Sequence, residues 1–381
     1  MPAFPASDPT PSNAANPLSI PEPISDQDRY SRQVLFPGIG EAGQQHLRRA
    51  HVAIVGVGAT GAATAGLLAR AGVGHLTLID RDFVEPSNLQ RQTLFDEDDA
   101  RAALPKAEAA RRHLARINSG VHVTAHIADL VPLNAADLLN ADIVLDCTDN
   151  FETRYLINDL CVRDHRPWIY AAAVGAYAAT MNILPKPSAN PDEPGAQPLA
   201  SEMLAGEPTA CLACIFPSAP SGNVETCDTA GILSTAVNLA ASIQVTEALK
   251  FLTRQPHLMR RSLLSFDLWS NQRSEINTSA PRADCEVCGQ RIFRALSGEQ
   301  RPHITLCGRN SVQIHQHHHP IDLAALQSRL QSLGDVRANG LLLRFTYPPY
   351  TLTVFPDGRA LIQGTTDTGL ARALYARFLG S

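Results

Sequence analysis

Three glycines near residue 56 have the spacing of a phosphate-binding turn. The stretch IVGVGATG, residues 54–61, carries Gly56, Gly58 and Gly61 as G-x-G-x-x-G between an apolar run and an alanine-rich segment of helical character. Such glycines permit a tight strand-to-helix turn, and the N–H groups at the helix N-terminus can then hold a phosphate. Asp80 ends the next apolar run, where a carboxylate can accept hydrogen bonds from ribose hydroxyls. The pattern predicts a nucleotide site and suits NAD and ATP equally.

Polar side chains beyond Asp80 favour ATP. Asn88, Arg91 and Gln92 lie within DFVEPSNLQRQ, and Lys106 begins a helical segment at LPKAEAARRHL. A triphosphate that loses pyrophosphate needs donors and positive charge where negative charge builds up, whereas NAD needs no such clamp. One of these cations alone would be an ordinary surface charge. Their combination predicts a triphosphate site.

A cluster of polar residues ends a third apolar run, VLDCTDN, residues 144–150. Asp146, Asp149 and Asn150 stand there at the predicted carboxyl end of a buried strand, where ligands of open α/β sheets bind. An aspartate at this place can hold Mg²⁺ against phosphate oxygens. Asp149 or Asn150 would equally well cap the helix that begins at FETRYLIND. Both interpretations stay open at this point.

Two CxxC pairs predict a metal site. Cys211 and Cys214 form the first pair, and Cys285 and Cys288 form the second. Four thiolates make a closed tetrahedral zinc site. The alternative is two unrelated pairs of reduced thiols, and such repetition is rare without metal or redox chemistry.

The elements that must position these residues alternate between strand and helix patterns through residues 51–150. This rhythm predicts a Rossmann-like, mostly parallel sheet with helices on both faces. Strand-like runs follow at 168–185, then a surface loop from about 186 to 208, a long helix at 232–253 and a strand at 263–269. The apolar stretch 231–252 contains Asn238, Gln244, Glu247 and Lys250, which favours a packed interior helix over a membrane span.

The pattern changes from about residue 301. Residues 301–381 read as a small α+β domain with the order β-α-β-β-β-α, and Asp357-Gly358 between alternating apolar runs predicts a hairpin. The run His315–His319 is either a metal-binding tract or, as we favour, a flexible surface segment. We therefore expect three parts: a disordered lead at 1–26, an ATP-binding domain with the zinc knuckles at 27–298, and a C-terminal α+β domain of undetermined role at 299–381.

Composition excludes some partners. The chain has 381 residues, 44% of them hydrophobic, and a formal net charge of −5. This balance gives no broad attraction to nucleic acid or anionic membranes. The Pro-, Ala- and Ser-rich lead has neither a basic start nor an apolar core, so it does not resemble a signal peptide. We expect a cytoplasmic protein that binds neither nucleic acid nor membrane.

The motifs together resemble one family. RYSRQVLF, GVGATG, LIDRDFVEPSNLQRQ, LPKAEAARRHLARIN, VLDCTDN, CLAC, CDTAG and CEVCG occur in an order that strongly resembles the ThiF/MoeB/HesA adenylyltransferases, bacterial relatives of ubiquitin-activating enzymes. The resemblance covers about residues 27–292. Ala59 departs from the G-x-G-G-x-G of many members, and the segment 301–381 is absent from minimal ones.

The resemblance implies a reaction and roles for individual residues. ATP and Mg²⁺ would activate the C-terminal glycine carboxylate of a ubiquitin-like sulfur-carrier protein as an acyl-adenylate. Asp80 would bind the ribose, Asn88, Arg91 and Lys106 the phosphates, and Asp149 the Mg²⁺ ion.

The resemblance also implies a homodimer, a structural zinc and further partners. Arg32 would reach into the partner subunit's site, and the four paired cysteines would bind Zn²⁺. Cys227, in CDTAG, would align with a cysteine that receives the activated carboxylate in some members and is dispensable in others. A half-buried structural thiol is the alternative for Cys227. A sulfurtransferase or a cysteine desulfurase is a further candidate partner.

Two rival functions remain at this stage. An NAD(P)-dependent oxidoreductase would need a base facing the hydride and no Arg/Lys clamp. A non-catalytic scaffold that binds a ubiquitin fold would have no need of Asn88, Arg91, Lys106 and Asp149. The sequence does not distinguish thiamine, molybdopterin or cysteine synthesis from protein conjugation.

Overall fold

The computed structural model describes residues 24–188, 208–218, 230–298, 304–307, 311–314 and 320–379, with residues 304–307 described by backbone alone. Cys227, the histidine run 315–319, residues 1–23 of the predicted lead and most of the predicted loop at 186–208 lie outside these residues, so the interpretations placed on them stay predictions.

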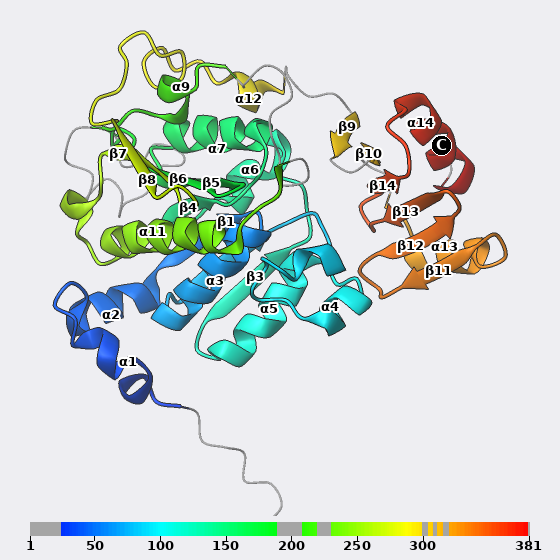
Figure 1. Cartoon of the computed structure of the whole chain (residues 1–381), viewed down its shortest axis with the longest axis horizontal. Helices are drawn as coiled ribbons and strands as arrows, with labels where there is room; N and C mark the ends of the chain where they lie inside the picture. The colour runs from blue at the N-terminus through cyan, green and yellow to red at the C-terminus, as the bar shows by residue number, and fades with distance from the viewer. Residues whose placement is uncertain are drawn as a thin grey trace, which may run out of the picture.

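A mixed sheet forms the centre of the large part of the molecule (Figure 1). Its order is β3-β2-β1-β4-β5-β6-β7-β8, in which the neighbours from β3 to β5 are parallel and those from β5 to β8 are antiparallel. The strands are β1 His51–Val55, β2 His75–Ile79, β3 His122–His126, β4 Ile143–Asp146, β5 Trp168–Val174, β6 Tyr177–Ile183, β7 Ser262–Asp267 and β8 Gln272–Asn277.

Helices cover both faces of this sheet (Figure 1). In β1, Val52 and Ile54 join one buried cluster and Ala53 and Val55 join the other, because successive side chains of a strand point to opposite faces. The helical elements are α1 Asp26–Val34, α2 Gly40–Arg49, α3 Ala59–Ala71, η1 Pro86–Asn88, α4 Glu97–Arg101, α5 Lys106–Ile117, α6 Pro132–Leu138, α7 Phe151–Arg163, α9 Leu212–Ile215, α11 Ser234–Leu252, η2 Pro256–Leu258 and α12 Arg294–Ser297.

The long apolar helix α11 packs inside the molecule against α3, β5 and β6. Its buried Gln244 donates hydrogen bonds to the carbonyl oxygens of Asp146 and Ile169 at 2.8 and 2.9 Å. The polar side chain is therefore satisfied within the protein. No helix in the described part of the chain is long and apolar enough to cross a membrane.

A second, antiparallel sheet follows, with the order β11-β12-β13-β14-β10-β9. The predicted hairpin is confirmed: β13 pairs with β14, and Gly358 between them has φ +86°. The elements are β9 Ile304–Cys307, β10 Ser311–Ile314, α13 Leu323–Leu330, β11 Asp335–Ala338, β12 Leu343–Tyr347, β13 Tyr350–Val354, β14 Ala360–Gln363 and α14 Thr368–Leu379.

The predicted order of this second unit was wrong by two strands. The run HITLCGRNSVQI, expected as one strand, folds as the β9–β10 pair, and β11 was not expected at all. The sequence of β11 is DVRA, and its side chains are mostly exposed, so it carries no apolar alternation. The predicted fold class, a Rossmann-like mostly parallel sheet followed by a small α+β unit, is confirmed.

Candidate functional site

The glycine turn between β1 and α3 is built by close backbone contacts. Gly56 has φ +83°, and a Cβ there would lie 2.8 Å from the carbonyl oxygen of Cys147. A Cβ on Gly61 would overlap the carbonyl oxygen of Gly56, whereas one on Gly58 would meet nothing nearer than 3.9 Å. Gly56 and Gly61 therefore let the chain turn tightly, and Gly58 leaves the helix N-terminus accessible.

A cavity of about 400 Å³ opens beside this turn, at the carboxyl ends of β1, β2 and β4. The sheet order reverses between β1 and β4, which is where open α/β sheets bind ligands. Most of the predicted nucleotide residues line this one cavity: Gly56, Gly58, Asp80, Asn88, Arg91, Gln92, Lys106 and Asp149. Gly61 supports the turn from behind without lining the cavity.

Asp80 is held rigidly at the end of β2. Its carboxylate accepts hydrogen bonds from the backbone N–H of Val57, at 2.6 Å, and of Asp82, at 2.7 Å. Burial raises the pKa of this carboxyl above its ordinary value. The link to Val57 ties the acidic side chain to the glycine turn, so the two predicted nucleotide-binding features form one unit.

Lys106 supplies a buried cation at the N-terminus of α5. Its Nζ lies 3.1 Å from Oδ2 of Asp82. Burial favours the neutral amine, but the carboxylates of Asp82 and Asp80 outweigh it and hold the pKa of Lys106 above its ordinary value. Lys106 is therefore a cation in the cavity at neutral pH. Asp82 was missed in the sequence, although it stands two residues after Asp80.

The segment after β2 contributes three more polar side chains. Asn88 is buried and its Oδ1 accepts from the N–H of Glu85 at 3.0 Å, which fixes η1. Arg91 donates to the carbonyl of Ser87 at 2.8 Å and lines the cavity. Gln92 is buried, and its Oε1 has no hydrogen-bond partner among the described residues. An unpartnered buried oxygen is costly unless a ligand or water meets it.

The three polar residues at the end of β4, Asp146, Asp149 and Asn150, make different contacts in the structure. Asn150 is the N-cap of α7, because its Oδ1 accepts from the N–H of Thr153 at 2.8 Å. Asp146 is fully buried and pairs with Arg154, Nε to Oδ2, at 3.1 Å. Asp149 makes neither contact and is exposed on the cavity wall. The capping alternative therefore belongs to Asn150, and Asp149 remains available to a ligand.

Arg32 does not line this cavity. It lies in the last turn of α1, with its side chain exposed. Leu35 and Phe36, just beyond it, are 71% and 62% exposed, which is unusual for large apolar side chains.

The four paired cysteines converge. Cys211 Sγ lies 3.9 Å from Cys214 Sγ and 3.6 Å from Cys285 Sγ, and Cys214 Sγ lies 3.4 Å from Cys288 Sγ. Four sulfurs at about 2.3 Å from a central zinc would stand about 3.8 Å apart. The cluster is therefore consistent with one tetrahedral zinc ion, which would join the start of α9 to the segment before α12.

A second cavity, of about 640 Å³, lies beside this cysteine cluster. Tyr155, Asp159, Cys285 and Arg294 are among its lining residues. It is larger than the cavity at the glycine turn, but none of the predicted nucleotide residues lines it. The chemistry indicated by the motifs therefore belongs to the smaller cavity.

Comparisons with known proteins agree with this geometry. The model of the ThiF family matches residues 30–287. The chain is 43% identical over 357 residues to the sulfur carrier protein ThiS adenylyltransferase of Bacillus subtilis, covering 92% of this chain and 99% of that protein. It is 36% identical over 281 residues to the adenylyltransferase and sulfurtransferase MOCS3 of Drosophila grimshawi, covering 70% of this chain and 57% of that protein.

A solved structure shares the fold. The crystal structure of E. coli MccB with ATP matches with a TM-score of 0.55 at 24% identity, covering 69% of this chain and 74% of that one.

The two sequence relatives differ in how much of them this chain covers. It spans nearly all of the Bacillus protein and only about half of the MOCS3 protein.

Proposed function

Because the chain belongs to the ThiF family of adenylyltransferases, we propose that it adenylylates the C-terminal glycine carboxylate of a ubiquitin-like sulfur-carrier protein. The observation that carries this proposal is the convergence of Arg91, Lys106 and Asn88 with Asp80 and Asp149 in one cavity. The relative in Bacillus subtilis is named for a sulfur carrier, and it matches this chain over nearly its whole length.

In the reaction, a carboxylate oxygen of the carrier attacks the α-phosphorus of ATP, and the bond from that phosphorus to the bridging oxygen breaks. Pyrophosphate leaves and an acyl-adenylate remains on the carrier. Lys106 and Arg91 stabilise the negative charge that grows on the phosphates. Asp80 holds the ribose, so the α-phosphorus is positioned against the incoming carboxylate.

Asp149 suits a magnesium ligand by its chemistry and place. It is an oxygen donor on the same cavity wall as the proposed phosphate residues, and Mg²⁺ prefers one or two carboxylates together with phosphate oxygens. Bound Mg²⁺ would neutralise charge on the phosphates. Asp149 would hold and orient it, while Asn150 fixes the start of α7.

We place a structural zinc in the cysteine cluster formed by Cys211, Cys214, Cys285 and Cys288. The backbone N–H of Arg282 lies 3.4 Å from Cys214 Sγ, and such donors stabilise a thiolate. A closed site of four sulfurs leaves no position for substrate, so the zinc supports the fold and takes no part in the chemistry.

A homodimer would account for the exposed position of Arg32 away from its own cavity and for the exposed apolar side chains next to it. The exposed Leu35 and Phe36 form an apolar surface on which a second copy can pack, and this would carry Arg32 to the partner's cavity. Cys227 is proposed as the thiol whose thiolate attacks the acyl-adenylate, so that a thioester forms between Cys227 and the carrier and AMP leaves. A sulfurtransferase or cysteine desulfurase would then supply sulfur.

The dimer leads to a complementation prediction. An Arg32→Ala chain mixed with a Lys106→Ala chain should regain activity, because the mixed dimer has one site in which both cations are intact. Random exchange of subunits in a two-fold dimer restores about a quarter of the sites. The measurement is ATP–pyrophosphate exchange before and after mixing. If subunit exchange is proven by mass and no activity returns, Arg32 does not act across the interface.

The function itself is tested by pyrophosphate exchange with a carrier that ends in Gly-Gly. We expect exchange to require the carrier, ATP and Mg²⁺ together, and to vanish when the carrier's final glycine is removed. Tight binding of NADH without any binding of ATP would favour the oxidoreductase instead. ATP binding without exchange would favour the scaffold.

A further inference from the structure

The C-terminal sheet has two covered faces. On β10 and β14, Val312, Ile314, Ala360 and Ile362 pack against α13 and α14 in the core of the second unit. The alternate residues point the other way, and Gln313 on that face is still only 3% exposed. A sheet face that met only water would leave such a residue exposed. The large domain must therefore cover this face.

Contacts between the two units show which part of the large domain covers this face of the C-terminal sheet. Arg344, Thr353, Leu361 and Gln313 stand opposite one another across β12, β13, β14 and β10. The Arg344 guanidinium lies 5.8 Å from the centre of the Phe83 ring, and Gln313 Nε2 lies 3.5 Å from Asp129 Oδ2. Phe83 also packs with Leu342 and Phe355 in a small apolar cluster between the two units.

One arginine of the β13–β14 hairpin locks this contact. Arg359 is 2% exposed, and it donates to the carbonyl oxygen of Arg81 at 3.1 Å and of Ile127 at 3.5 Å. These carbonyls stand just past the ends of β2 and β3, next to Asp80. A buried guanidinium is costly unless partnered. Within its own hairpin Arg359 is near only the carboxylate of Asp357, 3.5 Å from Nε, and its two terminal nitrogens find acceptors only at the strand ends that frame the cavity.

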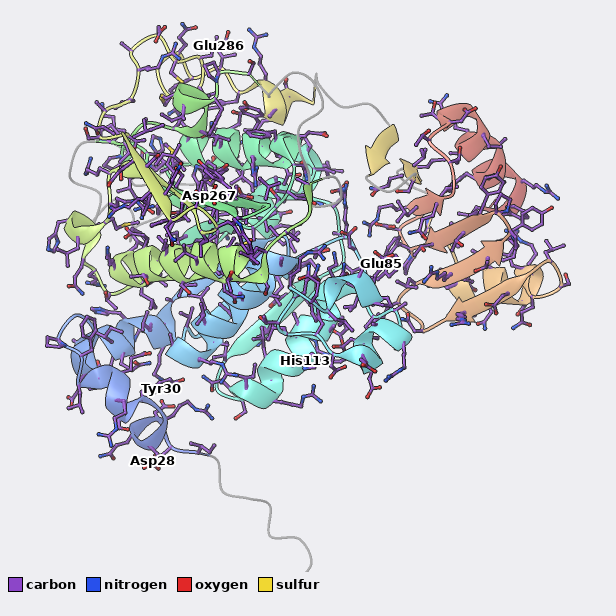
Figure 2. All side chains as sticks on the ribbon, viewed as in Figure 1. Asp28, Tyr30, Glu85, His113, Asp267 and Glu286 are labelled. Carbon is purple, nitrogen blue, oxygen red and sulfur yellow. The ribbon has the colours of Figure 1, made fainter. Side chains whose placement is uncertain are left out.

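The same sheet face reaches the nucleotide cavity. Ser311 and Gln363 stand opposite each other in the β10–β14 pair, and both line the cavity beside Asp129 and Leu130. In Figure 2, Glu85, another lining residue, lies on the side of the large domain that faces the C-terminal sheet. The second unit thus forms one wall of the cavity.

The charges of the side chains that line the cavity indicate which end of a bound nucleotide contacts this wall. Arg91 and Lys106 mark the phosphate end, whereas Ser311 and Gln363 on the wall are neutral and the nearby Asp129 of the large domain is paired with Arg81 at 3.4 Å. Neutral hydroxyl and amide groups do not offset the charge of a triphosphate, but they hydrogen-bond readily to a sugar or base edge. Building on the proposed function, we infer that Ser311 and Gln363 contact the nucleoside of ATP and that Arg359 positions this wall.

Calorimetric titration of the full chain with Mg²⁺ and three ligands tests the inference: ATP, GTP and inorganic tripolyphosphate. The variant carries Ser311→Ala and Gln363→Leu. It should bind ATP about tenfold more weakly, the effect of losing one or two buried hydrogen bonds. Its preference for ATP over GTP should fall, and its affinity for tripolyphosphate should stay that of the wild type. Lys106→Ala should instead weaken both ATP and tripolyphosphate.

The matched control is Thr351→Val. Thr351 stands opposite Gln363 in the β13–β14 pair on the same sheet face, but it does not line the cavity, so all three affinities should be unchanged. Arg359→Ala should weaken ATP but spare tripolyphosphate, and Arg359→Lys should restore part of the loss. The single variants Ser311→Ala and Gln363→Leu serve if the double variant does not fold.

Two results overturn the inference while the proposed function stands. One is unchanged ATP affinity in the wall variants, and the other is an equal loss for ATP and tripolyphosphate. A wild-type protein that does not bind ATP would overturn the proposed function itself.

Discussion

Replacing Asp149 with alanine should slow ATP–pyrophosphate exchange by a factor on the order of 10² while leaving the melting temperature unchanged. Asp149 lies exposed on the cavity wall and makes no cap, so its loss costs the fold little. In the proposed reaction it holds the Mg²⁺ that neutralises the phosphates. The readouts are the exchange rate at saturating carrier and a thermal melt of the same sample.

The neighbouring residue provides the matched control. Asn150→Ala removes the N-cap of α7 and should cost about 1 kcal/mol of stability. Its exchange rate at a temperature well below melting should stay within a few-fold of the wild type. An Asp149→Ala enzyme with the wild-type rate would show that Asp149 does not hold the catalytic metal.

Replacing Cys285 with serine should remove zinc and destabilise the protein by several kcal/mol. The cluster joins α9 to the segment before α12, and α7 packs against both helices. Metal binding is linked to folding, so the loss of one of four thiolates should appear as a lower melting temperature and not only as a lower rate. The measurements are zinc content per chain and thermal unfolding.

Cys161→Ala is the control for this change. Cys161 is a buried thiol outside the cluster, and its truncation leaves the four sulfurs in place. It should keep about one zinc ion per chain, as a closed site of four thiolates predicts. A Cys285→Ser protein with normal zinc content and normal stability would contradict the zinc site.

The sequence was sufficient for most of the large sheet, because strands such as β1 and β4 are buried on both faces and the helices between the strands have strong periodic patterns. Short buried runs such as residues 51–55 and 143–146, when they alternate with helical segments, are typical of strands in a covered parallel sheet. The sequence missed β8, Gln272–Asn277, whose side chains are all exposed. The sequence did not predict β11 either, because its residues DVRA are mostly exposed and show no alternation of apolar and polar side chains. The separate strands β9 and β10 were missed because HITLCGRNSVQI was read as one strand.

The residues of the candidate site likewise include some that the sequence predicted and some that only the structure shows. Gly56, Asp80 and Lys106 belong to three separate motifs, and they could be proposed as one site because a Rossmann-like order brings strand ends to one edge. Asp149 and Asn150 could not be separated by sequence, since only the bond from Thr153 shows which of them caps α7. Ser311 and Gln363 could not be found at all, because their approach to the cavity depends on how two units pack.

The central claim is that this cavity transfers an adenylyl group to a carrier protein, and intact-mass analysis of the carrier tests it most directly. The purified enzyme is incubated with ATP, Mg²⁺, pyrophosphatase and a carrier ending in Gly-Gly, and the carrier is then weighed. We predict a carrier heavier by one adenylyl group, which disappears when Lys106→Ala enzyme or a carrier without its last glycine is used. A carrier of unchanged mass, with ATP intact and NADH bound tightly by the enzyme, would contradict the account.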